Sequence, residues 1–281
     1  MTLQNKIHKK DVGLKTQRLF CFMKPFKIFA HLIWFVFLTL TTQVGGLIWI
    51  ITLLMCNLKK WKKRYAFVVL YFVCNLLIVP PLAKQFGREQ LPILNNNLKP
   101  RNLFYPLLFR NYVTPKLKNL LINSSEALKK DNIKIIYLDA NFPFYNGFPL
   151  LPHKSHDDGK KIDICFSYKT KEGKITNKKP AFSGYGIYVN ENNYSNKNCL
   201  EKGYWQYNLT KYLTLGKVND LDFDAKNTKK IILSFLSQNE TQKIFIEPYL
   251  KNNLDLINFK KIRFQGCKAV RHDDHIHLQV K

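Results

Sequence analysis

The chain has 281 residues, 46% of them hydrophobic, and a formal net charge of +26, which leaves room for a membrane segment and one domain of ordinary size. Residues 1–130 contain only three acidic residues and carry a net charge of +18, against +8 for residues 131–281. No base-reading pattern accompanies the lysines, so we expect no nucleic-acid partner and favour anionic lipid or cell-wall polymer. The lysines of the second half could equally serve only to keep the surface solvated.

Two apolar runs follow a basic tail, residues 1–27. Each run is about as long as the roughly 20 apolar residues that cross a bilayer, and a second run directly after a long first one argues against a cleaved signal peptide. We therefore predict a transmembrane hairpin of two helices, at about residues 28–55 and 65–83. The alternative is a pair of buried helices in a soluble core.

The loop between the two runs is KKWKKR, residues 59–64. The positive-inside tendency makes such a loop cytoplasmic, which would place the C-terminal part of the chain outside. The tail before the first run is also basic, however, so charge alone leaves the orientation open.

Residues 84–114 are irregular, with several Pro and Asn, and we predict a linker there. The remainder, residues 115–281, is typical of one α+β domain. Spacing of apolar residues predicts helices at 115–130 and 226–238. Runs rich in β-branched and aromatic residues predict strands at 133–140, 161–168, 184–189, 244–250, 261–264 and 275–280.

Five of the seven histidines lie in two short clusters, at residues 152–164 and 270–280. In a strand, residues two apart point to the same face, so His275 and His277 could reach one metal, or one could bind while the other does acid–base work. A His-x-His pair by itself is more often a surface or structural feature than a ligand pair.

The first cluster supplies the rest of a metal site. Gly159 permits a turn, so that His156 precedes the turn and Asp163 lies on the following strand. Two imidazoles and one carboxylate give zinc three ligands and leave one position for water, which the metal would polarise together with a scissile carbonyl. The two clusters together predict a zinc site.

Both clusters resemble motifs of one enzyme family. SHDDGKKIDI, residues 155–164, resembles the SHxxGxxxDI motif of the penicillin-insensitive murein endopeptidases, zinc enzymes of the lysostaphin/D-Ala-D-Ala peptidase superfamily. HDDHIH, residues 272–277, is similar to that family's HDDHFH motif. The resemblance covers roughly residues 130–281 and implies a zinc peptidase domain with a central antiparallel sheet. Arg271 and Leu278 depart from the family pattern, and we expect both near the substrate cleft.

The resemblance also implies roles for single residues. His275 and His272 would be the catalytic histidines, and Asp273 and Asp274 could orient them. His153 could line the site or contact the metal. The implied zinc ligands are His156, Asp163 and His277.

These observations predict a membrane-anchored zinc peptidase that hydrolyses peptide bonds of peptidoglycan stem peptides or cross-links. Its partners would be peptidoglycan and membrane lipid, in a bacterial cell membrane with the C-terminal domain extracytoplasmic. One alternative is a catalytically inactive membrane protein with a structural zinc site that binds anionic wall polymer or lipid. Another is a related zinc hydrolase acting on a different small peptide.

The six cysteines form no CxxC pair, which argues against a cysteine-based zinc site. A disulfide between Cys199 and Cys267 would form if the second half is extracytoplasmic, and the sequence does not decide this. The oligomeric state stays open.

Overall fold

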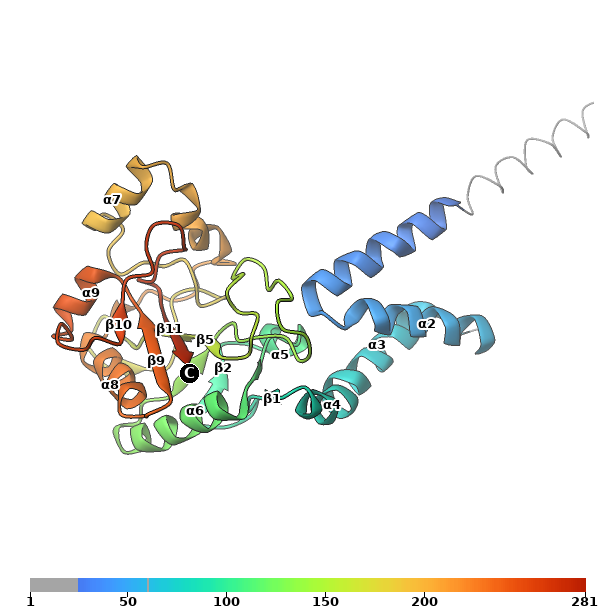
Figure 1. Cartoon of the computed structure of the whole chain (residues 1–281), viewed down its shortest axis with the longest axis horizontal. Coiled ribbons are helices and arrows are strands. Elements are labelled where there is room, and N and C mark those ends of the chain that lie inside the picture. The colour runs from blue at the N-terminus through green and yellow to red at the C-terminus, as the bar shows by residue number, and fades with distance from the viewer. Residues whose placement is uncertain (1–24, 60) are drawn as a thin grey trace, which may run out of the picture. The chain divides into compact units, whose positions relative to one another are not determined.

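The computed structural model describes residues 25–59 and 61–281, so most of the basic tail and Lys60 lie outside the described residues. Two compact units divide the chain, Met1–Cys74 and Asn75–Lys281. Figure 1 shows the elements of each unit.

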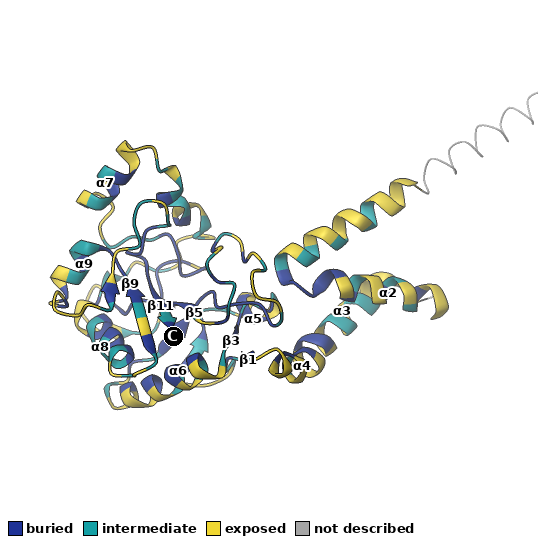
Figure 2. Cartoon of the chain, viewed as in Figure 1, coloured by how far each residue is buried: buried dark blue, intermediate teal, exposed yellow. Residues whose placement is uncertain are grey.

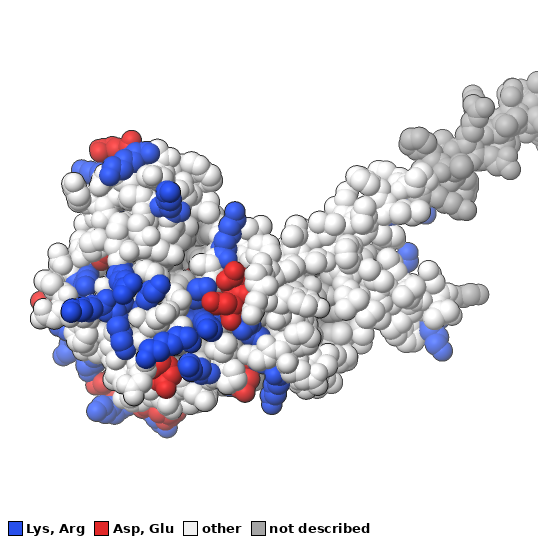
Figure 3. All heavy atoms as spheres, in the orientation of Figure 1, with Lys and Arg blue, Asp and Glu red and all other residues white. Residues whose placement is uncertain are grey.

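The N-terminal unit consists of apolar helices. The helix Pro25–Thr42 is followed by α2 (Gly45–Lys59) and by α3 (Lys63–Val73), which continues into the next unit as a π-helical turn (Cys74–Ile78) and α4 (Val79–Gln85). Two helices, Pro25–Thr42 and Lys63–Gln85, are long and apolar enough to cross a membrane by length and composition. Many of their large apolar side chains are exposed, and their surface in Figure 3 is mostly uncharged.

The first predicted span is divided, so the prediction of one helix over residues 28–55 is wrong. Gln43 has a φ of 66°, and the Thr42 hydroxyl accepts a hydrogen bond from the backbone N–H of Gly45 at 2.7 Å. A Cβ atom on Gly46 would lie 2.7 Å from the carbonyl oxygen of Phe35. This close approach admits only glycine at position 46. The TTQVGG sequence of residues 41–46 was a signal of the turn inside the predicted span.

A six-stranded mixed sheet forms the centre of the C-terminal unit. Its strand order is β10 (Ile262–Arg263), β9 (Thr241–Phe245), β11 (His275–Val280), β5 (Lys161–Cys165), β4 (Ile135–Tyr137) and β2 (Leu98–Pro100). The four inner strands are antiparallel, whereas β10 pairs with β9, and β2 with β4, in parallel. The predicted antiparallel sheet is therefore wrong at both edges, because helices α9 and α6 lie between the paired edge strands in the sequence and return the chain in the same direction.

Further short elements surround this sheet. The small sheets are β1 (Glu89–Gln90) with β3 (Tyr112–Val113), and β7 (Ile175–Thr176), β6 (Tyr168–Lys169) and β8 (Asp222–Phe223). The helices are α5 (Phe104–Leu107), α6 (Pro115–Leu128), α7 (Tyr194–Glu201), α8 (Ala225–Leu236) and α9 (Pro248–Asn253), with 3₁₀ turns at Lys129–Asp131 and Trp205–Leu213.

The main core lies between the sheet and the helices α6 and α8. Along β5, Ile162 and Ile164 face this core, and along β11 Ile276, Leu278 and Val280 do so. Figure 2 shows buried strands beneath helices whose outer faces are exposed. The alternate residues of both strands therefore project from the opposite face of the sheet, where the candidate site lies.

Several predicted elements are confirmed and others differ. The predicted helices correspond to α6 and α8, and the strand at 275–280 is β11. Residues 84–114, predicted as a linker, instead supply β2 and buried side chains such as Leu98 and Tyr105. Residues 184–189, predicted as a strand, belong to no strand.

Candidate metal centre

The register of β5 and β11 builds half of the site. His277 lies directly opposite Asp163 in this antiparallel pair, and His275 lies opposite Cys165. Because side chains alternate along a strand, both histidines and Asp163 project from the same face of the sheet. The prediction that His275 and His277 share a face is confirmed, and all three side chains are buried.

His156 reaches the same place from the loop before β5. Gly159 has a φ of 75°, a backbone conformation that favours glycine at the predicted turn, and the guanidinium of Arg88 packs against its Cα side. Nδ1 of His156 donates a hydrogen bond to the carbonyl oxygen of Ala140 at 2.9 Å. A carbonyl only accepts, so Nδ1 carries the proton and Nε2 is left facing Asp163.

Three donor atoms converge. Nε2 of His156 lies 3.2 Å from Nδ1 of His277 and 3.3 Å from Oδ1 of Asp163, and the last two atoms are 2.9 Å apart. A tetrahedral zinc ion with bonds of about 2.0–2.2 Å separates its ligand atoms by roughly 3.3–3.5 Å. The three atoms therefore lie close to the positions that one such ion requires.

The charge states of the group also suit a metal. Burial by itself would raise the pKa of Asp163, but the neighbouring histidines outweigh it and hold that pKa well below its usual value. Burial lowers the pKa of His277 to about 4. The group thus offers a carboxylate and a neutral imidazole, the forms that bind metal.

His153 belongs to a second, overlapping group. His153, His156 and Asp163 are buried and could hold a metal ion between them. Nδ1 of His153 lies 3.2 Å from Oδ2 of Asp163, the carboxylate oxygen that faces away from His277. The two groups share His156 and Asp163, and differ in whether His153 or His277 is the third member.

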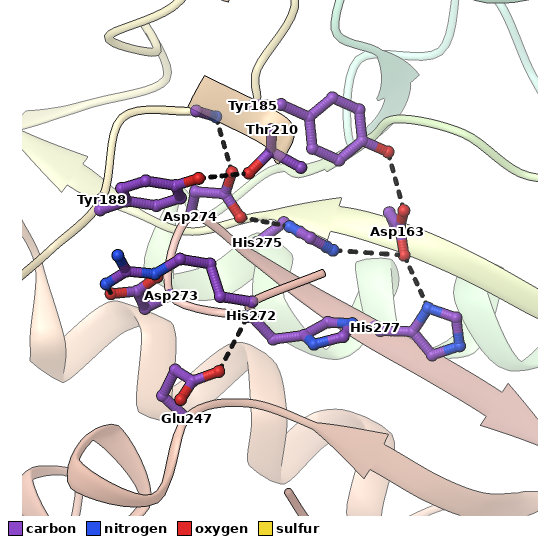
Figure 4. A network of polar contacts seen from close by, with 12 residues as sticks. Asp163, Tyr185, Tyr188, Thr210, Glu247, His272, Asp273, Asp274, His275 and His277 are labelled. Atoms are coloured by element: carbon purple, nitrogen blue, oxygen red, sulfur yellow. Dashed lines mark hydrogen bonds and ion pairs between the residues drawn. The ribbon is translucent and has the colours of Figure 1, made fainter. Parts of the chain in front are cut away.

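His275 lies between two carboxylates. Its Nδ1 hydrogen-bonds to Asp274, whose second oxygen accepts the backbone N–H of Gly186 at 2.6 Å. Its Nε2 lies 3.7 Å from Oδ1 of Asp163, an ion pair drawn in Figure 4, and among the described residues it has no hydrogen-bond partner. Burial would lower the pKa of His275, but Asp163 and Asp274 outweigh it and raise the pKa to about 9.

His272 lies beside these histidines. Its ring centroid is 4.9 Å from that of His275 and 5.6 Å from that of His277. Its backbone N–H donates to Glu247 at 3.1 Å, which fixes the turn before β11. Burial lowers the pKa of His272 well below its usual value, so the ring is neutral. The structure thus gathers all six predicted site residues, His153 included, on one face of the sheet.

Tyr185 is a site residue that the sequence patterns did not reveal. Its hydroxyl donates to Oδ2 of Asp163 at 2.8 Å, and its ring lies 4.9 Å from that of His153. The flanking glycines, Gly184 and Gly186, have φ values of 98° and 81°. The Gly-Tyr-Gly sequence was the available signal, because glycines on both sides are typical of a turn and not of a strand.

We expect the Tyr185→Phe variant to keep its fold and bind zinc more weakly. The hydroxyl fixes Oδ2 of Asp163 and so orients the carboxylate, and loss of such an outer contact lowers metal affinity by about 10–100-fold. Competition with a fluorescent zinc chelator measures the affinity. Tyr188→Phe, which removes a hydroxyl bonded to Thr210 at 2.9 Å, is the matched control. Equal affinities in Tyr185→Phe and the wild type would contradict the role of Tyr185.

The two residues that depart from the family pattern, Arg271 and Leu278, are both buried. Arg271 is fully buried, and its guanidinium forms a double ion pair with Asp273 and stacks 3.8 Å from the centre of the Tyr188 ring. It also donates to the carbonyl oxygen of Asn190 at 2.8 Å. Leu278 is buried in the core on the opposite face of the sheet. Arg271 instead ties the loop that carries Tyr185 to the turn before β11.

We expect Arg271→Met to destabilise the domain by about 3–5 kcal/mol, because it leaves the buried carboxylate of Asp273 without its counter-ion. Thermal unfolding of the full chain in detergent measures the effect. Combining it with Asp273→Asn should recover part of the loss, and Arg263→Met, at an exposed arginine of β10, should change little. If Arg271→Met is as stable as the wild type, the ion pair between Arg271 and Asp273 contributes nothing to stability.

A disulfide joins Cys199 of α7 to Cys267, in the loop that precedes the second histidine cluster. The pairing that the sequence left open is therefore present. Cys56, Cys74 and Cys165 are free.

Comparison with known proteins identifies no family for the chain. No protein-family model matches it, and a search of curated proteins finds no match. The case for its function therefore depends on the site itself.

Proposed function

We propose that the chain is a membrane-anchored zinc peptidase that hydrolyses peptide bonds of peptidoglycan. The observation that carries the proposal is the convergence of Nε2 of His156, Oδ1 of Asp163 and Nδ1 of His277 within 2.9–3.3 Å. Beside them lies the buried Nε2 of His275, which has no hydrogen-bond partner among the described residues. Three protein ligands with one position left are typical of catalytic zinc sites. The resemblance of both histidine motifs to the murein endopeptidases supports the same reaction class.

Each residue then has a role that its contacts permit. Zinc, when bound, would polarise a water molecule and the scissile carbonyl. Asp274 holds His275 through Nδ1, and the raised pKa keeps Nε2 protonated, so that Nε2, which faces the carboxylate of Asp163, can donate a proton to the leaving amine. Neutral His272, next to His275, can donate a hydrogen bond to the carbonyl oxygen as it gains charge.

Features outside the site support the location and the partner. The disulfide is of a kind that persists in oxidising compartments, which favours an extracytoplasmic C-terminal unit. The face shown in Figure 3 carries many lysines and arginines and few acids, which suits an anionic polymer or lipid. Two helices long enough to span a bilayer suit an anchor.

Digestion of purified peptidoglycan by the full chain in detergent tests the activity. We expect loss of cross-linked muropeptides with zinc, none after chelation, and none with His277→Ala. Gln279→Ala, on the same face of β11, is the matched control. Cleavage that persists after complete removal of zinc would refute the proposal.

The catalytically inactive alternative requires a closed site, in which His275 supplies a fourth ligand through Nε2. Tight zinc binding by the wild type with no cleavage of peptidoglycan or of other small peptides would favour it. Cleavage only of peptides unrelated to peptidoglycan would favour a different zinc hydrolase.

The orientation has its own test. If the C-terminal unit is extracytoplasmic, an alkaline phosphatase fused after Lys281 is active in cells and a green fluorescent protein at that position is dark. Two results together would place the domain in the cytoplasm. The phosphatase fusion would be inactive, and alkylation in intact cells would trap Cys199 and Cys267 as free thiols.

A further inference from the structure

A pocket of about 260 Å³ lies beside the candidate metal centre. Its lining is mostly apolar and includes Phe104, Leu151 and Leu213, which we call the rim, together with three polar residues, Arg110, Asp139 and His153, which we call the wall. His153 lines the pocket and also contacts the candidate metal centre, because its Nδ1 lies 3.2 Å from Oδ2 of Asp163. A molecule in this pocket would therefore sit directly beside the metal centre.

Arg110 is a fixed cation in this wall. Its Nε donates to Oδ1 of Asp139 at 2.5 Å, and its Nη2 donates to the carbonyl oxygen of Leu151 at 2.9 Å. Among the described residues, Nη1 takes part in no hydrogen bond. Two contacts thus hold the guanidinium still and leave one edge able to receive a carboxylate.

Two acceptor atoms lie in the same wall. Nε2 of His153 is buried and has no partner in the described chain, and Oδ2 of Asp139 is 3.9 Å away from it. That separation is too long for a direct hydrogen bond, yet one ammonium group could donate to both atoms. Among the described residues, Oδ2 of Asp139 also accepts a long hydrogen bond, of 3.5 Å, from the hydroxyl of Tyr185.

We propose that this pocket binds the zwitterionic head of an α-amino acid, with the carboxylate on Arg110 and the ammonium between Asp139 and His153. The wall carries one positive and one negative side chain, so a zwitterion matches it better than a single charge does. The apolar rim suits a short aliphatic remainder. Two sources offer this group: a released C-terminal amino acid, or the free side-chain end of a diamino acid within a peptide.

Binding is measured on the metal-free full chain in detergent, because amino acids chelate zinc. The probes are D-alanine, L-alanine and 2,6-diaminopimelate, with propionate and ethylamine as the two halves of the head group, and competition in ligand-observed NMR gives each Kd. We expect saturable binding of the amino acids and at least about tenfold weaker binding of either half. Tighter binding of alanine indicates the released residue, and tighter binding of diaminopimelate indicates the side-chain end.

Variants locate the binding. Arg110→Gln should weaken it by at least about tenfold, and Leu213→Trp, which places a larger side chain in the pocket, should abolish it. Arg263→Gln, at the far edge of the sheet, is the matched control, and melting temperatures show that each variant is folded. Propionate binding as tightly as alanine, or alanine binding unchanged by Leu213→Trp, would overturn the proposal.

Selection of substrate by this pocket rests on the proposed peptidase function, whereas the binding itself does not. If amino acids bind but no peptide is cleaved, the proposed binding pocket is supported and the proposed peptidase function is refuted. If zinc-dependent cleavage occurs but no amino acid binds, the peptidase function is supported and the pocket proposal is refuted.

Discussion

We expect His277→Ala to bind zinc at least about a hundredfold more weakly than the wild type, because it removes one of three ligands of a metal whose binding free energy is about 10–16 kcal/mol. His156→Ala should behave in the same way. The zinc content of the purified protein, by atomic emission, and chelator competition measure the loss.

His153→Ala decides between the two overlapping groups of possible ligands. If His277 is the third ligand, His153→Ala keeps one zinc ion per chain and His277→Ala loses it. The reverse result would assign the metal to the group His153, His156 and Asp163. Zinc should also raise the melting temperature of the wild type, since a ligand at a thousand times its Kd adds about 4 kcal/mol of stability.

The second large effect is expected from His275→Ala, which should keep its zinc and cut peptidoglycan about 10²–10⁴-fold more slowly. Nε2 of His275 has no hydrogen-bond partner among the described residues and is the group placed to move a proton. Zinc content and the initial rate of muropeptide release, measured on the same preparation, separate the two properties.

Asp274→Asn gives a graded comparison. This variant weakens the hydrogen bond to Nδ1 of His275 but keeps the imidazole and its Nε2. We therefore expect the rate of peptidoglycan cleavage to fall less than in His275→Ala. Loss of zinc by His275→Ala would instead make His275 a ligand, close the site and support the structural alternative.

Much of the fold and the site could be predicted from the sequence because the signals are local. Alternation in HIHLQV predicted both the strand and the shared face of His275 and His277, and the spacing of apolar residues predicted α6 and α8. The turn at Gly159 followed from the need to bring His156 back towards Asp163.

The remainder depends on contacts that no short window contains. The three-residue strand β2 is too short to have a period, and its place is set by the parallel pairing with β4. Arginine is rarely fully buried, so the residue type alone argues against a buried Arg271. It is buried because its guanidinium pairs with Asp273 and stacks on Tyr188. Tyr185 reaches Asp163 from a loop that no periodic pattern marks.

The position of His277 opposite Asp163 has a consequence for the order of events during synthesis. The two residues are 114 positions apart, and a ribosome that adds about 5–20 residues per second delivers the first roughly 6–23 seconds before the second. During that interval the nascent chain holds His156 and Asp163 without His277. A zinc ion bound by His156, Asp163 and His277, as we propose, would be captured only after β11 has docked between β5 and β9, whereas the group His153, His156 and Asp163 would be complete before β11 is made.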